Sequence, residues 1–462
     1  MTAFRLGDVR GLYPDEVDEA FADRFAAAFV RRFGISGTIA TGRDARGSSE
    51  PLQQALNDGL VNAGVNVANL GLCPTELGYF ASTLPAICAA IIVTASHNPE
   101  HYNGFKCVLK NGEAVSFDTG LREVMQLMQR PQGLSTGTRG SVCGLDLQAQ
   151  YLEFFRQRFS FDNGFGGRMA LNGLNGTAAT LACDLAESLS LDTGWIRRQP
   201  GTLPAEGADP NHPVLAAEMK QHMLANDFDL GVAWDGDCDR CVFFDDKGNL
   251  VPTYYMVGMF ADDFLTRCPG SAVVFDSKLC WNTLNIIRSR GGKAVRSATG
   301  HAFMKRSMRD HQAVYGGELS SHHFFRDFFY CDSGMFTWLS LLDVLARREQ
   351  RLGDLVAAQT ENICSTAEIN LPLTDCADIL DAVRSRYAAT ALVVDEFDGL
   401  SMELPGGWRF SLTRSKTEPL LRLNMESREG RERLQDSGAD LLRLLQPYTT
   451  SEQSLEDQLV IH

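Results

Sequence analysis

The chain has 462 residues and a formal net charge of −15, from 43 Lys and Arg against 58 Asp and Glu. Its 44% hydrophobic and 22% charged residues are typical of folded globular proteins, so a disordered chain is not expected. The acidic balance argues against a nucleic-acid partner, and no apolar run approaches the ~20 residues of a membrane helix, so we expect no membrane partner either. Residues 1–10 lack the apolar segment of a secretory signal, which favours a cytoplasmic protein.

The N-terminal third alternates helix and strand patterns. Apolar positions recur at helical spacing over residues 15–33, and Gly34 follows them. The next expected elements are a strand at 38–41, a helix at 51–62, a strand at 65–70, a helix at 74–82 and a buried strand at 89–94. Alternation of this kind predicts an α/β domain with a largely parallel sheet.

The same alternation restarts twice, and the end of the chain differs. The restarts are expected as strand, helix and strand at 169–171, 177–189 and 230–234, then as strand, helix, strand and helix at 272–275, 281–290, 294–296 and 302–308. The last part combines strands at 367–371, 400–404, 408–412 and 419–424 with helices at 375–387 and 431–445. We predict three α/β domains, 1–148, 149–250 and 251–364, and a C-terminal α+β domain, 365–462.

Twelve cysteines are spread along the chain without regular spacing, and we expect them to be reduced thiols. Cys238 and Cys241 form a single CxxC pair. A structural zinc site normally needs a second pair of ligands, and no similar pair occurs, so we expect no zinc site.

The first segment with chemical character is residues 94–99, which read TASHNP and follow the predicted strand at 89–94. Ligands of open parallel sheets lie beyond the carboxyl ends of the strands, so Ser96 is a candidate nucleophile. Pro99 restrains the backbone of Asn98 and fixes the turn. The alternative is an ordinary strand-to-loop turn.

The second segment is residues 235–240, which read DGDCDR and follow the predicted strand at 230–234. Asp235, Asp237 and Asp239 alternate, so three carboxylates can turn toward one hard cation, and oxygen ligands suit Mg²⁺. A calcium-binding loop also begins with alternating aspartates, but its glycine stands at the sixth position and a Glu at the twelfth. Here the glycine is second and no Glu stands at the twelfth position. The other alternative is an acidic surface turn.

Two further segments carry polar side chains at close spacing. Residues 317–323 read GELSSHH, where Glu318, Ser320 and His322 alternate and would present three hydrogen-bonding groups to a polyhydroxylated ligand. The adjacent histidines could instead indicate a metal site, but no cluster of further potential ligands stands nearby in the sequence. Residues 414–419 read RSKTEP, a candidate phosphate loop whose alternative is a solvated hairpin turn. The four segments together supply the parts of a phosphoryl-transfer site.

In this order the four segments resemble the phosphoserine, metal, sugar and phosphate loops of the α-D-phosphohexomutase superfamily, above all its bacterial phosphomannomutase branch. The resemblance runs over nearly the whole chain. Further matching stretches are GDVRG at 7–11, GRD at 42–44, YNGFK at 102–106, TGHAF at 299–303 and HHFFRDF at 322–328.

The resemblance implies a four-domain, heart-shaped architecture, with three α/β domains that have mixed or parallel sheets and a C-terminal α+β domain. It implies that Ser96 is phosphorylated and donates its phosphoryl group to a hexose 1- or 6-phosphate. The resulting hexose 1,6-bisphosphate, which is also the activator, would turn around and return its other phosphoryl group to Ser96. Mg²⁺ is the implied cofactor, hexose phosphates are the implied partners, and we expect a monomer or weak dimer.

The resemblance also implies roles for the site residues. Asp235, Asp237 and Asp239 would hold Mg²⁺ together with an oxygen of the phosphorylated Ser96. The other implied roles are Arg10 and Arg240 for the transferring phosphoryl group, Lys106 and His301 for proton transfer, Glu318, Ser320 and His322 for the sugar, and Arg414, Ser415, Lys416 and Thr417 for the second phosphate. Since Lys106 must release a proton easily, we expect cations such as Arg10 to lower its pKa.

The phosphate loop departs from the family pattern, which usually places Arg two residues before the serine that matches Ser415 and Asn directly after that serine. Here Thr413 stands at the Arg position, Arg414 follows it, and Lys416 stands at the Asn position. A shift of one residue turns a strand side chain to the opposite face. Either the loop bends to bring Arg414 back, or Lys416 supplies the charge without the bidentate fork of arginine.

The sugar is the main open choice. We expect a phosphomannomutase that interconverts mannose 6-phosphate and mannose 1-phosphate, and a phosphoglucomutase or a dual-specificity enzyme is the alternative. Two further hypotheses are a sugar-phosphate-binding protein that has lost turnover, motivated by the altered phosphate loop, and a metal-dependent phosphatase.

Overall fold

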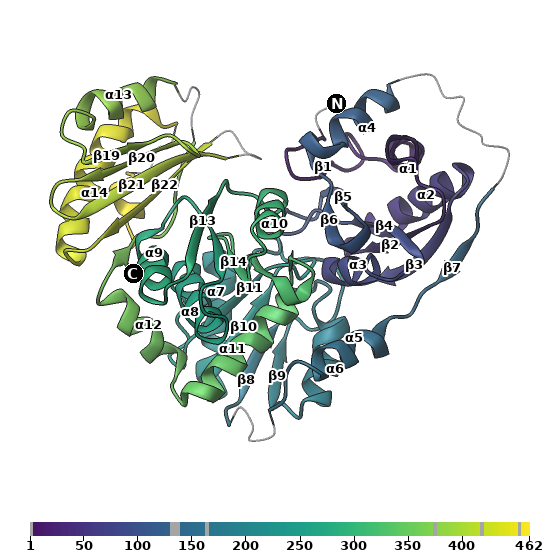
Figure 1. The fold of residues 1–462 in the computed structure, drawn as a ribbon, viewed down its shortest axis with the longest axis horizontal. Coiled ribbons are helices and arrows are strands. Elements are labelled where there is room, and N and C mark those ends of the chain that lie inside the picture. Colours follow the sequence, from purple (N-terminus) through teal and green to yellow (C-terminus); the bar gives the residue numbers. More distant parts are fainter. Residues whose placement is uncertain (1–2, 130–138, 162–165, 373–376, 416–419, 451–453) are drawn as a thin grey trace. The chain divides into compact units, whose positions relative to one another are not determined.

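The computed structural model describes residues 3–129, 139–161, 166–372, 377–415, 420–450 and 454–462. The chain forms two compact units, one of residues 1–250 with 321–352 and the other of residues 251–320 with 353–462. Figure 1 shows the helices and strands of both units, coloured along the chain. Within the described ranges, none of the helices combines the length and the apolar character that crossing a membrane requires.

The first unit begins with a mixed seven-stranded sheet in the order β1-β5-β4-β2-β3-β7, with β6 paired to β5. Its strands are β1 (Val9–Leu12), β2 (Thr38–Arg43), β3 (Asn66–Leu72), β4 (Ile87–Val93), β5 (Tyr102–Leu109), β6 (Glu113–Ala114) and β7 (Val142–Gly144). Strands β4, β2, β3 and β7 run parallel, whereas β5 is antiparallel to both β4 and β1.

Helices lie on both faces of this sheet (Figure 1). They are α1 (Glu19–Phe33), α2 (Ser49–Asn62), α3 (Thr75–Ala81) and α4 (Leu121–Met128). The carboxylate of Asp18 caps α1 by accepting the N–H of Phe21 at 2.6 Å, and Gly34 ends the helix with a left-handed backbone. The sequence pattern predicted this helix and its glycine stop.

Strand β4 is apolar on both faces because helices cover both. Ala89, Ile91 and Val93 belong to the core that α1, α2 and α4 share with the sheet. The intervening Ile92 faces α3, where a Cβ atom on Gly78 would lie 2.5 Å from its Cδ1. Glycine at position 78 therefore allows α3 to approach the sheet closely, and this places the start of α3 beside the carboxyl ends of the parallel strands.

The second sheet of the first unit has the order β11-β10-β8-β9, and only β11 runs antiparallel to its neighbour. Its strands are β8 (Met169–Asn172), β9 (Thr193–Ile196), β10 (Leu230–Trp234) and β11 (Cys241–Phe244), and its helices are α5 (Gln148–Arg156), α6 (Ala179–Ser188) and α7 (Pro213–Ala225). Met219 and Met223 of α7 pack with Ala170, Ala233 and Phe244 of the strands.

The first unit also contains a hairpin and a long helix from later in the chain. They are β15 (His323–Phe325), β16 (Cys331–Asp332), which pairs antiparallel with β15, and α11 (Gly334–Arg348). Phe336 of α11 lies 4.4 Å from Phe325 and 6.0 Å from Phe155 of α5, measured between ring centroids. Aromatic packing thus attaches this later segment to α5.

The second unit begins with α/β elements. They are α8 (Thr253–Arg267), β12 (Ala272–Asp276), α9 (Trp281–Ser289), β13 (Lys293–Ser297), α10 (His301–Asp310) and β14 (Tyr315–Gly317). Strand β12 lies between β13 and β14 and runs parallel to both. The carboxyl end of β12 leads to Ser277 and Lys278, both buried.

The C-terminal part of the second unit is an antiparallel sheet of six strands in the order β17-β22-β21-β20-β19, with β18 paired to β22. Its strands are β17 (Cys364–Ser365), β18 (Ile369–Pro372), β19 (Val393–Asp395), β20 (Leu400–Leu404), β21 (Trp408–Arg414) and β22 (Leu420–Ser427), and the helices are α12 (Leu352–Thr360), α13 (Ala377–Tyr387) and α14 (Arg431–Leu445). Leu441 and Leu445 of α14 pack against Phe410 and Leu423 of the sheet.

A buried carboxylate connects this sheet to the α/β part of the same unit. Oε1 of Glu426 accepts the N–H of Cys280 at 2.9 Å and pairs with Nη1 of Arg409 at 2.6 Å, and Oε2 accepts the N–H of Trp281 at 3.1 Å. Glu426 therefore satisfies donors at the first turn of α9, where a negative charge is favoured.

The predicted fold class is confirmed, with three α/β sheets followed by an antiparallel α+β domain. The elements predicted at 230–234, 400–404 and 431–445 coincide with β10, β20 and α14. The sequence did not predict the two long helices α8 and α11, because most of their residues are buried and they present no polar face at helical spacing.

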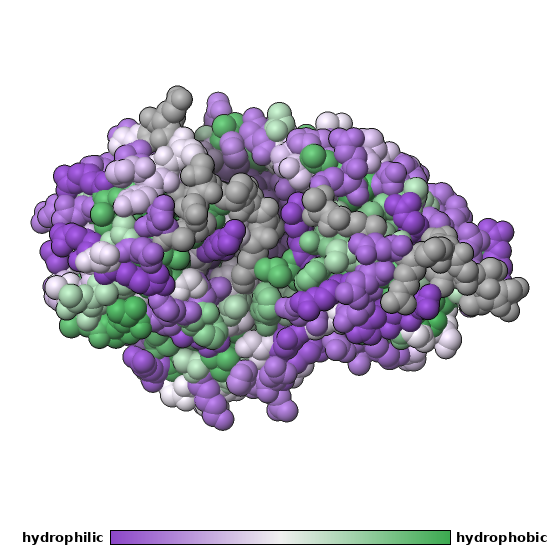
Figure 2. Space-filling view, turned by 90° about the horizontal axis from the view of Figure 1, so that it is seen from above, coloured by the Kyte–Doolittle hydropathy of each residue, from purple (hydrophilic) through white to green (hydrophobic). Residues whose placement is uncertain are grey.

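On the face shown in Figure 2, hydrophilic residues are widespread and hydrophobic residues are interspersed among them.

Candidate active site

Ser96 lies in the turn that follows β4, as the sequence predicted. Its backbone has a left-handed conformation with φ of 54°, and its side chain is buried. Oγ1 of Thr94 accepts the N–H of Ser96 at 2.8 Å, and the carbonyl oxygen of Ala95 accepts the N–H of Asn98 at 3.1 Å. A non-glycine residue in this conformation is held there by its surroundings, which is common at functional sites.

The buried side chain of Arg46 stabilises this turn through hydrogen bonds to its backbone. The guanidinium of Arg46 donates to the carbonyl oxygens of Ser96 at 2.8 Å, Asn98 at 2.6 Å and Pro99 at 2.6 Å. Its Nε donates to Asp44 at 3.0 Å, which keeps the guanidinium plane in place. The fork of five donors explains why arginine suits this position.

The three aspartates predicted to hold a metal come together directly after β10. Asp235, Asp237 and Asp239 are buried, and each contributes a carboxylate oxygen to a group whose atoms lie within 4.8 Å of one another. Oγ of Ser96 donates to Oδ2 of Asp235 at 2.8 Å. The structure thus brings the predicted nucleophile to the predicted metal loop, although the two follow strands of different sheets.

Cations surround these carboxylates. Nζ of Lys106 on β5 donates to Oδ2 of Asp237 at 2.7 Å and to Oδ2 of Asp239. Nε of Arg240 lies 3.7 Å from Oδ2 of Asp235. Arg10 on β1 donates to Oδ1 of Asn98 in the serine turn at 2.6 Å. All three predicted basic residues of this region therefore lie at the aspartates or at the serine turn.

The expected lowering of the pKa of Lys106 is wrong. Burial does favour a lower pKa, and Arg10 acts in the same direction, but the charges of Asp237, Asp239 and Asp235 outweigh both and raise the pKa. The ammonium of Lys106 is therefore charged and acts as a counter-ion to the aspartates.

The electrostatics of Asp235, Asp237 and Asp239 favour the binding of a cation. Burial and the charges of Asp239 and Asp237 raise the pKa of Asp235 above its usual range. Burial opposes ionisation of Asp239 too, but Lys106 and His322 hold its pKa well below the usual range. Within the described part of the chain, Oδ1 of Asp237 is buried and accepts no hydrogen bond. Oδ1 of Asp239 is likewise buried without a hydrogen-bond partner among the described residues. A buried set of carboxylate oxygens with two of them unsatisfied fits a hard cation such as Mg²⁺.

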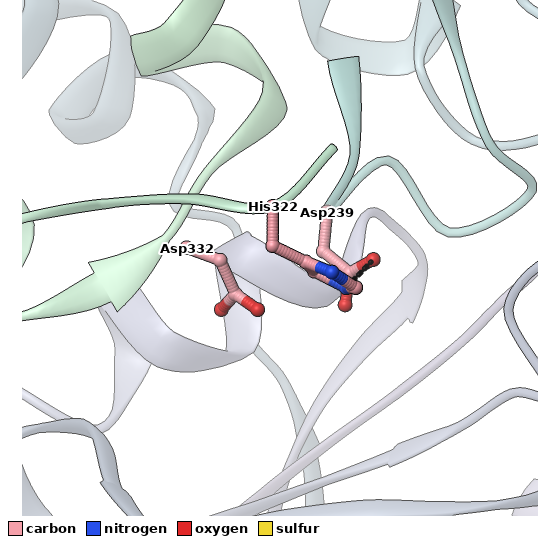
Figure 3. Close-up of side chains that lie close together, drawn as sticks. All are labelled: Asp239, His322 and Asp332. Atoms are coloured by element: carbon pink, nitrogen blue, oxygen red, sulfur yellow. Dashed lines mark ion pairs between the residues drawn. The ribbon is translucent and has the colours of Figure 1, made fainter. Parts of the chain in front are cut away.

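A second group of side chains adjoins the aspartates. Asp239, His322 and Asp332 are buried and offer potential ligand atoms within 4.8 Å of one another. Figure 3 shows these three side chains lying close together. Nε2 of His322 lies 3.4 Å from Oδ1 of Asp239. Of the predicted sugar-loop residues, His322 therefore lies beside the metal loop.

The other sugar-loop residues belong to the second unit. The carboxylate of Glu318 is buried and accepts the N–H of Gly300, the residue before His301 at the start of α10. Asp276 at the end of β12 accepts the N–H of Leu319 at 2.7 Å. These bonds fix the backbone around Glu318, while Ser320 is partly exposed.

Of the predicted phosphate-loop residues, Arg414 is the last residue of β21 and Ser415 follows it. Thr413 is buried and Arg414, the next residue of the strand, is exposed. Alternation along a strand puts the side chains of two successive residues on opposite faces. The N–H of Ser415 donates to the carbonyl oxygen of Leu420 at 2.9 Å. Lys416 and Thr417 lie outside the described residues.

Sequence reasoning missed two residues that hold this site in place. Arg46 follows the matched stretch at 42–44, but nothing in the sequence indicates that its side chain reaches the serine turn. Thr75 begins α3 and donates from Oγ1 to Oδ2 of Asp237 at 2.5 Å. A threonine at a helix start is ordinary, and its partner lies 162 residues away.

Comparisons with known proteins agree with this geometry. Models of the family "Phosphoglucomutase/phosphomannomutase" match as alpha/beta/alpha domain I over residues 1–132, domain II over 149–248 and domain III over 252–363. A phosphomannomutase of Escherichia coli is 36% identical over 454 residues, which cover 96% of this chain and 99% of that protein. A Xanthomonas campestris protein named for phosphohexose mutases is 36% identical over 433 residues, 93% of this chain and 95% of that protein.

Solved structures give the same result. A phosphoglucomutase/phosphomannomutase family protein from Burkholderia thailandensis superimposes with a TM-score of 0.85 at 30% identity, covering 97% of this chain and 98% of that one. An N-acetylphosphoglucosamine mutase from Aspergillus fumigatus, in complex with GlcNAc-6P and magnesium, shares the fold at a TM-score of 0.59 and 12% identity, over 97% and 96% of the two chains. The chain therefore belongs to the α-D-phosphohexomutase superfamily, and it is a phosphohexomutase similar to bacterial phosphomannomutases.

Proposed function

We propose that this phosphohexomutase interconverts mannose 6-phosphate and mannose 1-phosphate through a phosphoserine at Ser96 and a hexose 1,6-bisphosphate intermediate. The observation that carries the proposal is the hydrogen bond from Oγ of Ser96 to Oδ2 of Asp235, inside a buried group of three carboxylates. The names of the similar bacterial proteins support mannose as the sugar.

The proposed transfer balances without an outside reagent. A hydroxyl oxygen of the hexose monophosphate attacks the phosphorus of phosphorylated Ser96. The new bond joins phosphorus to the sugar oxygen, the bond from phosphorus to Oγ of Ser96 breaks, and its electron pair stays on Oγ. The proton released by the sugar hydroxyl is the proton that Oγ regains. The return step transfers the other phosphoryl group of the bisphosphate to Oγ in the same manner.

Asp235, Asp237 and Asp239 would hold Mg²⁺ in this proposal. The ion, when bound, offsets negative charge on the transferring phosphoryl group. Lys106 and Arg240 contact the same carboxylates and would add positive charge beside that group. Phosphoryl transfer depends on positioning and charge stabilisation more than on covalent chemistry, so a rigid serine turn is useful.

The remaining assignments follow the family resemblance. Arg10 contacts the serine turn through Asn98 and would orient the phosphoryl group. Lys106 and His301 are the proposed groups for moving the hydroxyl proton. For Lys106 this role requires that a bound cation offset the carboxylates that otherwise keep its ammonium charged. The proposed contacts to sugar and to the second phosphate are Glu318, Ser320, His322, Arg414, Ser415, Lys416 and Thr417.

The test of this proposal is Ser96→Ala, assayed for isomer formation with mannose 1-phosphate and added glucose 1,6-bisphosphate. We expect turnover to fall by at least about a thousandfold, as for loss of a nucleophile elsewhere. The matched control is Ser82→Ala, since Ser82 is also buried and its partners are not site residues: Oγ donates to the carbonyl oxygen of Tyr79 at 2.6 Å and accepts the N–H of Gly112 at 2.8 Å. Full turnover of Ser96→Ala would refute the phosphoserine mechanism.

The same assay separates the alternatives. Free phosphate released as fast as isomer forms would indicate a phosphatase. Ligand binding without isomerisation in the unaltered protein would indicate a binding protein that has lost turnover.

A further inference from the structure

Thr75 contacts the metal loop through two hydrogen bonds from the first residue of α3. Its N–H donates to the carbonyl oxygen of Asp237 at 2.9 Å, and its Oγ1 donates to Oδ2 of the same residue at 2.5 Å. Both residues are fully buried. Thr75, on a helix that packs on the first sheet, thus holds both the backbone and the side chain of Asp237, which follows a strand of the second sheet.

The side-chain bond distinguishes the two oxygens of Asp237. Oδ2 accepts from Thr75 and also from Nζ of Lys106 at 2.7 Å. Within the described residues, Oδ1 is buried without a hydrogen-bond partner. A carboxylate that is free to rotate about its χ2 angle could offer either oxygen, whereas two donors on Oδ2 leave Oδ1 as the atom available to a cation.

We propose that the hydroxyl of Thr75 is a positioning group for the Mg²⁺ site, which it sets by holding Oδ2 of Asp237 so that Oδ1 faces the ion. This inference rests on the proposed function, because it assumes that the three aspartates bind a divalent cation. Groups that orient a metal ligand typically change metal affinity by 10–100-fold when removed. Thr75 has this effect through Asp237 and makes no contact with substrate in the proposal.

The test uses Thr75→Val, which keeps the shape of the side chain and removes the donor, and Thr75→Ser, which keeps the donor. The control is Thr41→Val, since Thr41 is equally buried in the first sheet and its Oγ1 donates to Asn57 at 2.8 Å, away from the metal loop. The full-length proteins are brought to one phosphorylation state, checked by intact mass, and Mn²⁺ is titrated into each while free Mn²⁺ is followed by electron paramagnetic resonance.

We expect Thr75→Val to weaken Mn²⁺ binding by about 10–100-fold, Thr75→Ser to stay within about threefold of the unaltered protein, and Thr41→Val to leave the affinity unchanged. The rise in unfolding temperature that Mn²⁺ causes should shrink in Thr75→Val alone. If Thr75→Val does not fold, Thr75→Ala takes its place in the same comparison with Thr75→Ser.

Three results would overturn the inference while leaving the proposed function intact. They are an unchanged affinity in Thr75→Val, an equal loss in Thr41→Val, and a loss in Thr75→Ser as large as in Thr75→Val. By contrast, if the unaltered protein itself failed to bind Mn²⁺, the metal site of the proposed function would be wrong.

Discussion

Oγ of Ser96 and Oδ2 of Asp235 lie 2.8 Å apart, although the two residues are 139 positions apart in the chain. Each follows a parallel strand of a different sheet, β4 for Ser96 and β10 for Asp235. The hydrogen bond therefore exists only because the first two sheets pack within one compact unit. This contact is the basis for the proposed phosphoryl transfer.

Lys106 should stabilise the metal-free protein. In Lys106→Met the buried carboxylates of Asp237 and Asp239 lose their cation, and loss of one partner of a buried pair typically costs about 3–5 kcal/mol. We expect a lower free energy of unfolding in the presence of a chelator, with Mg²⁺ restoring more stability to the variant than to the unaltered protein. Urea unfolding with and without Mg²⁺ measures both quantities, and an unchanged metal-free stability would contradict the role given to Lys106.

Arg46 should affect the rate of the chemical step through the serine turn. Lysine at position 46 cannot reach the carbonyl oxygens of Ser96, Asn98 and Pro99 together, so we expect Arg46→Lys to lower kcat by roughly tenfold to a hundredfold. The control is Arg122→Lys, since Arg122 is exposed and pairs with Asp118. Steady-state kinetics measure kcat for both variants and for the unaltered protein. A kcat of Arg46→Lys equal to that of the unaltered protein would show that the turn does not need Arg46.

Glu76 should make stability depend on pH. Burial raises the pKa of Glu76 to about 8, against the effect of hydrogen bonds from Ser333 and Tyr151. The folded protein then binds a proton that the unfolded chain has lost above its ordinary pKa near 4.5, so stability falls as pH rises from about 5 to about 8, by up to about 1.4 kcal/mol per pH unit.

Glu76→Gln removes this titration and should flatten the slope over that range. The exposed Glu153 supplies the control Glu153→Gln, which should keep the slope of the unaltered protein. Unfolding free energies at several pH values measure the difference, and parallel curves for the Glu76 variant and the unaltered protein would show that Glu76 is ionised in the fold.

The sugar preference is tested by kcat/KM for mannose 1-phosphate and for glucose 1-phosphate. We expect mannose 1-phosphate to be preferred by about tenfold or more, because a site that hydrogen-bonds a hydroxyl of one configuration leaves polar groups unpaired with the other. Equal values would indicate a dual-specificity enzyme, and a glucose preference would show that the choice of mannose is wrong.

Much of the site was predictable because its residues stand directly after strands whose sequences are apolar and short. Ser96 and Asp235 both follow such strands, and local sequence is enough to place them at the edge of a sheet. Arg46 and Thr75 were not predictable, because their partners in the site lie far away in sequence and their own positions, a turn and a helix start, are ordinary. The raised pKa of Lys106 was missed for the same reason, since it depends on carboxylates 131 and 133 residues away.

The prediction of helices was also limited by contacts between residues far apart in the sequence. The helix α1 has a polar cap, an apolar stripe and a glycine stop, and its sequence predicts it. The helices α8 and α11 are buried on most sides by tertiary packing, which removes the periodic pattern on which prediction depends. The side on which Arg414 lies followed from strand alternation, whereas the phosphate loop beyond it involves Lys416 and Thr417, outside the described residues.

The central claim, a phosphoserine that exchanges its phosphoryl group with hexose phosphates, is tested most directly by mass spectrometry of the protein itself. Incubation with glucose 1,6-bisphosphate and Mg²⁺ should add one phosphoryl group, peptide mapping should place it on Ser96, and an excess of mannose 1-phosphate should remove it again. Turnover of hexose phosphates by a protein that never carries phosphate on Ser96 would contradict the claim.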